Sequence, residues 1–538
     1  MQNDAAKQHR SPDLQQENEM LRQQLGTLQQ QLEQKDVLIA HYLEQLRLLH
    51  KKQFGSSSEK NAIVPEQLSL FNEPEVLADD KAAEPTVEEI TYTRHKQKAT
   101  KEENLEDLVT ETVEHELTGT DLNCPQCGET MQEIKVEVRY EIKIIPAKVE
   151  VVKHRQHVYA CANCEANDIQ TPFAKGRGYE PFLPKSSASA ETIAWLLDQK
   201  YNLGLPLYRL EQNVQQQMGL TLSRQTMSNW ILKAAELYMK PMYDEMRRQL
   251  LLSQYLHADE TTLQVLNEPG RTAEQKSYMW LFRTGRGSPP IVLYDYQTTR
   301  ASKHPVRFLE GFSGTLQVDG YPGYNQLQPK IRLAGCWAHA RRKFTEVLDA
   351  LPKGTDKTGS LAIEALKMIG ELYALESKLK AAWSDKLTAD AVKAIQQTRQ
   401  EQSLAICNRY FQFCKTNKNR STGNLRKAME YSLNEEQKLR HYLTNVACEI
   451  DNNPAERAIK PFVMGRKAWL FSNTQRGARG SAMWFSLIVT AKENKLKVYD
   501  YLVYFLKRLQ TSGFDSATDW KALMPWSDEL PADLRVSQ

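Results

Sequence analysis

The chain has 538 residues, which is too many for one compact hydrophobic core, so we expect three or four domains. Its hydrophobic content of 41% suits globular domains, and no run approaches the roughly 18 apolar residues that a membrane helix requires. The N-terminal residues are polar and lack the apolar core of a signal peptide. We therefore expect a cytoplasmic protein with no membrane partner. The net charge of +3 excludes no class of partner.

Charge is unevenly distributed along the chain. Residues 73–117 are rich in Asp and Glu, whereas residues 457–479 carry six Arg or Lys residues and no acidic one. A basic segment inside a nearly neutral chain fits contact with a polyanion at one face. A solvated basic surface is the alternative.

The first 54 residues carry a heptad pattern. Apolar residues recur at alternating spacings of four and three from Leu14 to Leu49, and Asn18 occupies one position of the seam. This pattern predicts a coiled coil over residues 1–54 and therefore a homo-oligomer. The alternative is a single amphipathic helix that docks on its own chain. Residues 55–110 are acidic and polar with no lasting period, and we expect them to be a disordered linker.

Four of the eight cysteines form two Cys-x-x-Cys pairs. They are Cys124, Cys127, Cys161 and Cys164. Between the pairs, residues 136–159 alternate Val, Ile and Tyr with charged residues, as the strands of a hairpin do. Four thiolates suit a tetrahedral zinc ion, so we predict a zinc ribbon over residues 111–180 that holds one structural Zn²⁺. A redox pair is the alternative. The remaining cysteines are scattered, and we expect them to be small buried side chains: Cys336, Cys407, Cys414 and Cys448.

Residues 181–248 have a helical period. One helix is expected over 207–218, where Gly219 ends it, and Ser223 is placed to cap a second helix over 224–237. Two helices joined by a short turn that contains glycine predict a helix-turn-helix. The second helix begins with Arg224 and further polar residues, which are types that reach base edges and phosphates. An ordinary helical hairpin is the alternative.

The next segment has the pattern of an α/β core. Strands are expected over 254–265, 277–284, 291–296, 314–319 and 330–336, with helices over 302–310 and 337–348. Three antiparallel strands, a helix and further strands reached by crossovers are the ordering of the ribonuclease H-like fold. We expect this core over residues 249–349 and 446–500, with a helical insertion over 350–445 and a C-terminal element over 501–538. The whole chain is then a multidomain α+β protein.

Three acidic residues fall where such a core would use them. Asp259 lies inside the first strand, and Asp319 ends the fourth strand at a glycine turn. Asn453 is a good N-cap and Pro454 suits the first helical position, so Glu456 is expected in the first turn of a helix that follows the insertion. Half of a capping box is the alternative role of Glu456.

This group of carboxylates suits metal-dependent chemistry on DNA phosphodiesters. Two Mg²⁺ (or Mn²⁺) ions about 3.5–4 Å apart can serve both the attacking and the leaving oxygen, and magnesium takes hard oxygen ligands. We expect Asp259 to bridge both ions, and Asp319 and Glu456 to hold one ion each. Glu260 and Asp451 lie nearby in the sequence, and we expect them to support the site or to cap the helix.

Basic residues near these acids are expected to contact DNA phosphates. They lie on the helix that carries Glu456 and on the helix after the fifth strand: Arg457, Lys460, Arg466, Lys467, His339, Arg341 and Arg342. Trp337 and Trp469 could stack on an unpaired base. Burial in the core is the alternative for both tryptophans.

Five motifs carry a resemblance to a known family. They are His-Ala-Asp-Glu-Thr at 257–261, Val-Asp-Gly-Tyr-Pro-Gly-Tyr-Asn at 318–325, Cys-Trp-Ala-His-Ala-Arg-Arg-Lys-Phe at 336–344, Asn-Asn-Pro-Ala-Glu-Arg-Ala-Ile-Lys-Pro at 452–461 and Gly-Arg-Lys-Ala-Trp-Leu-Phe at 465–471. Together with the N-terminal segments, they resemble the insertion-sequence-66 family of transposases. The resemblance implies a DDE transposase that binds the ends of a bacterial insertion sequence, with Asp259, Asp319 and Glu456 as its triad. It also implies two small accessory proteins encoded on the same element.

Two other functions compete with a transposase on the sequence alone. A DNA-binding regulator that has lost catalysis would use the same coiled coil, zinc ribbon and helix-turn-helix, but it would have no need for three carboxylates. A ribonuclease or junction nuclease could share the fold. The DNA-binding segments at the N-terminal side speak against it.

Overall fold

The computed structural model describes residues 148–160, 173–175, 180–352, 359–383, 387–512 and 520–536, with four isolated positions among the first 35 residues. The coiled coil expected over 1–54 lies almost wholly outside the described residues, and the linker over 55–110 and the two Cys-x-x-Cys pairs lie entirely outside them. The chain divides into two compact units, and nearly all described residues belong to the unit that contains Glu150–Gln538. No described helix is long and apolar enough to cross a membrane.

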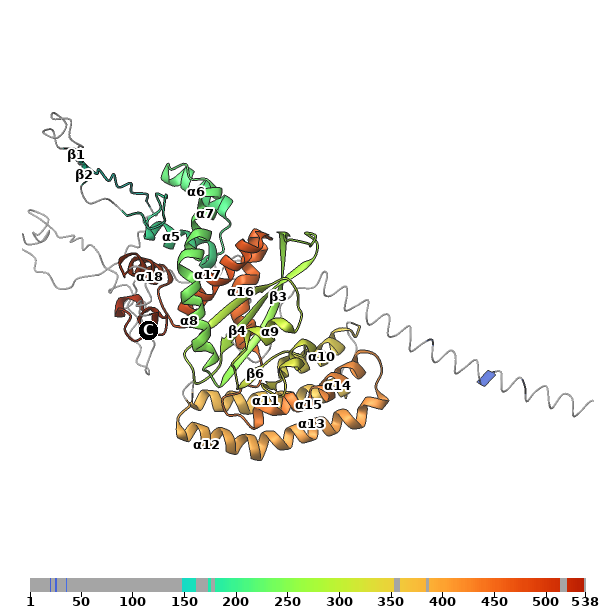
Figure 1. Ribbon diagram of the computed structural model, residues 1–538. Helices are drawn as coiled ribbons and strands as arrows, with labels where there is room; N and C mark the ends of the chain where they lie inside the picture. Colours follow the sequence, from blue (N-terminus) through green and yellow to red (C-terminus); the bar gives the residue numbers. More distant parts are fainter. Residues whose placement is uncertain are drawn as a thin grey trace, which may run out of the picture. The chain divides into compact units, whose positions relative to one another are not determined.

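A six-stranded mixed sheet forms the framework of this unit (Figure 1). Its strands are β3 (Tyr255–Asn267), β4 (Lys276–Thr284), β5 (Val292–Gln297), β6 (Thr315–Gln317), β7 (Arg332–Ala334) and β8 (Ser472–Thr474). The strand order is β5-β4-β3-β6-β7, and β8 pairs with the later part of β3. Strands β3, β4 and β5 are antiparallel, whereas β6 runs parallel to both β3 and β7.

Five of these strands, and the helix between β5 and β6, confirm the sequence prediction. Each strand from β3 to β7, like helix α9 (Lys303–Phe308), begins and ends within two residues of its predicted bounds. Strand β8 was not predicted. Its sequence, Ser-Asn-Thr, has no alternation of apolar and polar residues. The sequence therefore carries no sign of the strand that pairs with β3.

Alternate side chains of the sheet face two different layers. On one face, Phe282 of β4 stacks on Phe308 of α9. On the other face, Tyr294 of β5 contacts Phe462 of helix α16 (Asn453–Trp469). Directly opposed residues of an antiparallel pair point to the same face. These contacts therefore assign each residue of β3 to one layer or the other.

Helix α17 (Gln475–Glu493) closes the edge of the sheet at β5. The amide of Tyr294 donates to Ser486 Oγ at 2.8 Å, and the amide of Val292 donates to Thr490 Oγ1 at 2.9 Å. Ser486 and Thr490 are both fully buried. Amides that would be unpaired at an open edge are thus satisfied inside the domain, and β5 is closed to further strand pairing.

The predicted helix pair before the sheet is confirmed at its turn. Helix α6 (Leu207–Met218) ends at Gly219, whose φ of 67° lies in the left-handed region that glycine tolerates. The side chain of Ser223 caps helix α7 (Arg224–Ala234) by accepting a bond of 3.2 Å from the amide three residues on. Helix α7 is shorter than predicted because a π-helical turn, Ala235–Met239, follows it directly. The flanking helices are α5 (Ala190–Leu197) and α8 (Lys240–Leu251).

The residues expected to form an insertion are helical and share a second hydrophobic core. Their helices are α11 (Leu361–Trp383), α12 (Ala389–Thr398), α13 (Leu404–Asn417), α14 (Gly423–Asn434) and α15 (Glu436–Arg440). Trp337 of α10 (Trp337–Asp349) is fully buried in this core, and its indole N–H donates to the carbonyl of Leu439 at 2.9 Å. The idea that Trp337 stacks on an unpaired base is therefore wrong, and its core alternative is confirmed.

The four scattered cysteines are free thiols and are buried, as predicted: Cys336, Cys407, Cys414 and Cys448. Three of them belong to the second core and make no disulfide there. Small apolar packing explains their presence without any redox role.

Two further segments complete the described chain. Strand β1 (Val158–Ala160) pairs antiparallel with β2 (Phe173–Lys175), so the partner of β1 follows the second Cys-x-x-Cys pair in the sequence. Helix α18 (Val498–Ser512) begins just before the boundary expected at residue 501, and it is followed by α19 (Trp520–Leu523).

Candidate active site

Asp259 and Asp319 lie beside each other on neighbouring parallel strands. The last paired position of β3 and β6 is His257 opposite Gln317, and each aspartate lies two residues beyond it. The chain after β6 stays aligned, because the amide of Val318 still donates to β7 at 2.9 Å. Side chains two residues apart on a strand share a face, and adjacent strands are about 4.8 Å apart. The register therefore brings the two carboxylates together on one face of the sheet.

That face is the one covered by α16. Asp259 is opposed across the strands by Leu281, and Leu281 is opposed by Tyr294, which contacts α16. Glu260, the next residue, must then face the opposite layer. The side chains of Asp259 and Glu260 thus lie on opposite faces of the sheet. Only Asp259 of the pair points toward the helix that carries Glu456.

Glu260 is fully engaged on its own face. Arg300 Nε donates to Glu260 Oε1 at 2.7 Å, and the hydroxyl of Tyr324 donates to Oε2 at 2.6 Å. Arg300 also lies 4.0 Å from Asp319 Oδ2 and sits over the ring of Tyr321. Burial, followed by the charge of Asp319, raises the pKa of Glu260 above its usual value. Arg300 therefore links the carboxylate of one face to the aspartate at the end of β6.

The start of α16 is anchored to β3 by Asn452. Asn452 Nδ2 donates to the carbonyl of Ala258 at 2.8 Å, and Asn452 Oδ1 lies 2.9 Å from His257 Nδ1. The structure corrects the predicted cap: Asn452, not Asn453, is the N-cap residue, and no side-chain capping bond forms. The capping box expected as the alternative role of Glu456 is therefore absent. The physical reason is that the amide side chain of Asn452 is used for tertiary contacts with β3.

His257 extends this anchor to the segment before α16. It is fully buried, and its Nε2 lies 3.2 Å from Glu449 Oε2. Arg286 lies 3.9 Å from the other oxygen of Glu449. Burial alone would raise the pKa of Glu449, but the contacts with His257 and Arg286 outweigh it and lower the pKa to about 2. A charged carboxylate thus holds the imidazole two residues before Asp259.

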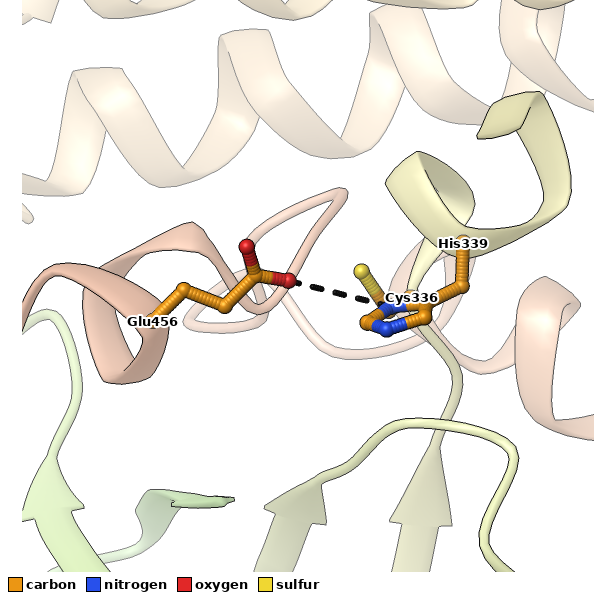
Figure 2. Close-up of side chains that lie close together, drawn as sticks. All are labelled: Cys336, His339 and Glu456. Carbon is orange, nitrogen blue, oxygen red and sulfur yellow. Dashed lines mark ion pairs between the residues drawn. The ribbon is translucent and has the colours of Figure 1, made fainter. Parts of the chain in front are cut away.

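Glu456 lies one helical turn after Asn452, because its amide donates to the carbonyl of Asn452 at 3.1 Å. Its carboxylate Oε1 is 3.8 Å from His339 Nδ1 of α10 (Figure 2). The same oxygen is 3.7 Å from Arg342 Nη2, also on α10. Burial, and then the charge of Arg342, lower the pKa of His339 to about 4. Glu456 of α16 therefore faces two groups of α10, the neutral imidazole of His339 and the guanidinium of Arg342.

The three carboxylates act on one another electrostatically. Burial raises the pKa of Asp259 well above its usual value, and the charges of Glu260, Asp319 and Glu456 raise it further. The amide of Glu260 donates to Asp259 Oδ1 at 2.8 Å and offsets only part of this. Burial and the neighbouring negative charges therefore both disfavour the ionised form of Asp259.

Four family models match the chain. Residues 185–480, more than half of the chain, match the DDE model of the transposase IS66 family. The chain belongs to this family. Residues 121–165 match the zinc-finger binding domain of transposase IS66, and residues 41–113 match a model described as transposase C of IS166 homeodomain. Residues 486–526 match the IS66 C-terminal element. The resemblance drawn from the sequence motifs is confirmed, and the protein is a DNA-processing enzyme with a zinc-finger region.

The transposase also resembles three proteins of Sinorhizobium fredii (strain NBRC 101917 / NGR234), each described as an uncharacterized protein. Protein y4qI is 32% identical over 403 residues, which cover 72% of this chain and 70% of y4qI. Protein y4jD is 29% identical over 419 residues, which cover 75% of this chain and 78% of y4jD. Protein y4hP is 26% identical over 500 residues, which cover 89% of this chain and 87% of y4hP.

The basic residues expected to contact DNA fall into two groups in this transposase. Arg224 is exposed at the start of α7, and Arg457, Lys460 and Lys467 are exposed along α16 at spacings that place them on one side of the helix. The residues of the other group are only partly exposed. Arg466 donates to Thr262 and Thr261 of β3, Arg341 lies 5.9 Å from the ring of Tyr373, and Arg342 and His339 lie against Glu456.

Several residues of the site were not singled out from the sequence. Asn452, His257 and Arg300 are the main ones, because each fixes a carboxylate-bearing element through contacts far apart in the chain. The one local signal was alternation in β3, which places His257 on the face of Asp259. Nothing local marks Arg300, since its partner Glu260 lies 40 residues earlier.

Proposed function

We propose that this transposase binds the ends of a bacterial insertion sequence and catalyses DNA cleavage and strand transfer with Asp259, Asp319 and Glu456 as its catalytic triad. The observation that carries the proposal is the register of β3 and β6, which sets the two aspartates beside each other on the face covered by α16. The anchored start of α16 then sets Glu456 one turn from a contact with Ala258, the neighbour of Asp259. The strand order supports a ribonuclease H-like core.

In this proposal the carboxylates bind two Mg²⁺ (or Mn²⁺) ions. Asp259, Asp319 and Glu456 would together hold these ions. When bound, the ions supply a potent nucleophile and stabilise the leaving oxygen. The raised pKa of Asp259 supports this assignment, because burial and then the nearby carboxylates disfavour its ionised form, which a bound divalent cation would stabilise. Arg300 and Arg342, which lie beside Asp319 and Glu456, orient these two side chains from the outside of the group.

The same proposal gives the DNA-binding groups distinct roles. Arg224 and the exposed start of α7 recognise the element ends in a DNA groove, as the second helix of a helix-turn-helix does. Arg457, Lys460 and Lys467 run away from Glu456 along α16 and contact the phosphates that flank the reacting bond. Arg466, Arg341, Arg342 and His339 line the same region but already have protein partners, so their contacts with DNA require those partners to be exchanged.

Outside the described residues, Cys124, Cys127, Cys161 and Cys164 hold one structural Zn²⁺. The match of residues 121–165 to a zinc-finger domain supports this, because that range contains all four cysteines. The coiled coil over 1–54 joins copies of the chain into a homo-oligomer, and two small proteins of the same element assist the reaction. The transposase acts in the cytoplasm, where it associates with the nucleoid.

The test uses purified full-length protein, the two accessory proteins of the same element and DNA that carries the terminal repeats flanking the gene. Asp259→Asn, Asp319→Asn and Glu456→Gln each lose cleavage and strand transfer while end binding stays near the wild-type level. Asp390→Asn and Glu364→Gln, which change exposed acids of the insertion, keep full activity. A wild-type-like variant among the first three removes that residue from the triad. A wild-type protein that binds the ends but cuts with neither Mg²⁺ nor Mn²⁺ favours a DNA-binding regulator instead.

A further inference from the structure

Three potential metal ligands of different chemistry converge where α10 meets α16. Cys336 is the N-cap residue of α10, and His339 lies one turn further along that helix. Glu456 faces them from α16 (Figure 2). The Cys336 sulfur, a ring nitrogen of His339 and a carboxylate oxygen of Glu456 all lie within 4.8 Å of one another. His339 Nδ1 and Glu456 Oε1 are 3.8 Å apart.

We propose that Cys336, His339 and Glu456 form a binding site for a zinc-like cation that is distinct from the magnesium-type site but shares Glu456 with it. A thiolate, an imidazole and a carboxylate are all established zinc ligands, and a soft sulfur ligand disfavours magnesium. Two anionic ligands and one divalent cation leave no net charge. This balance suits a site in which the cysteine is buried.

The geometry needs only small side-chain movements. Zinc bond lengths of about 2.0–2.3 Å imply ligand atoms about 3.3–3.8 Å apart around a tetrahedral ion. The His339–Glu456 pair, at 3.8 Å, is already close to that separation, and the widest pair must approach by about 1.5 Å at most. His339 and Glu456 are partly exposed at 23% and 31%, so both side chains have room to move toward the buried sulfur.

The surroundings of the sulfur resemble those of zinc-binding cysteines. The amide of Asn452 donates to Cys336 Sγ at 3.2 Å. Amide donors of this kind orient and stabilise a metal-bound thiolate. His339 Nδ1 is shielded from solvent and has no hydrogen-bond partner among the described residues, while it faces the carboxylate. Arg342, which is 40% exposed, is the group that must swing away from Glu456.

The shared ligand gives this site a regulatory consequence, which rests on the proposed function of Glu456. A zinc-like cation held by Cys336 and His339 draws Glu456 toward α10 and away from Asp259 and Asp319. Zinc would then inhibit magnesium-dependent cleavage by removing one carboxylate of the triad. The side chain of Cys336 takes no part in the proposed reaction, so its loss relieves inhibition without removing the triad.

Zinc content of the full-length protein tests the site without any need for catalysis. After saturation with zinc and removal of weakly held ions, wild type retains about two zinc ions per chain, one of them in the zinc finger. Cys336→Ala and His339→Ala each retain about one, whereas Cys414→Ala, which removes another buried thiol, retains two. Thermal unfolding checks that all variants are folded. Equal zinc content in wild type and both ligand variants overturns the site.

Inhibition of DNA cleavage tests the sharing of Glu456. Zinc added to a magnesium reaction lowers cleavage by wild type and by Cys414→Ala at least tenfold, and it leaves Cys336→Ala largely active. A wild-type protein that holds the second zinc and cleaves at full rate overturns the sharing of Glu456. A failure of the proposed triad shows itself separately, because Glu456→Gln would then cleave normally while it still loses the second zinc.

Discussion

Asn452 and Ala258 are joined by a hydrogen bond of 2.8 Å from the side-chain amide to the backbone carbonyl, although 194 residues separate them in the chain. Ala258 precedes Asp259, and Asn452 precedes the helix that carries Glu456. One buried side chain thus fixes the distance between two elements of the proposed triad. Most of the chain between them belongs to other strands and to the helical insertion, so this spacing depends on the tertiary fold.

Asn452→Ala should lose cleavage while end binding persists. The variant leaves the Ala258 carbonyl and a nitrogen of His257 without their partner, which costs about 1–3 kcal/mol of folding free energy. Denaturant unfolding and strand cleavage are the measurements. Asn453→Ala is the matched control, because it removes only the side-chain bond from Asn453 Nδ2 to Asp451 and no bond to β3. Equal cleavage defects in the two variants would argue against the anchor.

Arg300→Gln should lower the free energy of unfolding, because it leaves the Glu260 carboxylate buried without its cationic partner. Glu260 is 2% exposed and would lose its cationic partner, with a cost of about 1–3 kcal/mol because Arg300 itself is 40% exposed. Adding Glu260→Gln should recover part of the loss, since no buried charge then remains. Denaturant unfolding of the single and double variants measures this coupling. If the free-energy changes of the two single variants add up to that of the double variant, the Arg300–Glu260 ion pair is not the source of the effect.

Glu449→Gln should destabilise the protein in a pH-dependent way. The pKa of Glu449 is lowered from 4.5 to about 2, so its ionised form stabilises the fold at neutral pH, on the order of 2–3 kcal/mol. A lowered acid pKa gives stability that is present above 4.5 and is lost as the pH falls toward 2. The difference between wild type and variant should therefore narrow below about pH 4.5 in unfolding experiments. A difference that is constant with pH would assign the effect to packing.

Arg224→Ala should weaken binding to the element ends by about 1–3 kcal/mol and relax discrimination against unrelated DNA. Its side chain is exposed at the start of α7, where a recognition helix contacts base edges. Arg248→Ala on α8 is the control, because that arginine is exposed but pairs with Glu245 on its own helix. Binding curves at several salt concentrations make the comparison. Unchanged end binding by Arg224→Ala would favour an ordinary helical hairpin.

The strands and the two aspartates could be predicted because their signals are local. Strand-like runs of residues marked β3 to β7, and the glycine after Asp319 marked a strand end. The helix start was misplaced by one residue because Asn452 and Asn453 are chemically equal as caps. Only the tertiary contact of Asn452 with β3 distinguishes them.

Other features of the site depend on contacts that the sequence does not display. Arg466 was expected to contact DNA, yet its guanidinium donates to β3 because α16 packs along that strand. Strand β8 has no apolar pattern, and its pairing arises from the position of the chain after α16. Asp259 and Glu260 are adjacent acidic residues that face opposite layers. Which of them faces α16 is known only from the pairing of the strands.

The most direct measurement of the proposed triad is the metal preference of Asp319→Cys. Magnesium binds sulfur poorly, whereas manganese accepts it more readily, so a direct ligand can be identified by exchanging oxygen for sulfur. We predict that Asp319→Cys cleaves end DNA with Mn²⁺ but not with Mg²⁺, while Asp390→Cys, on the exposed surface of α12, behaves like wild type with both metals. Full cleavage by Asp319→Cys in Mg²⁺ would contradict a direct role of Asp319 in holding the metal.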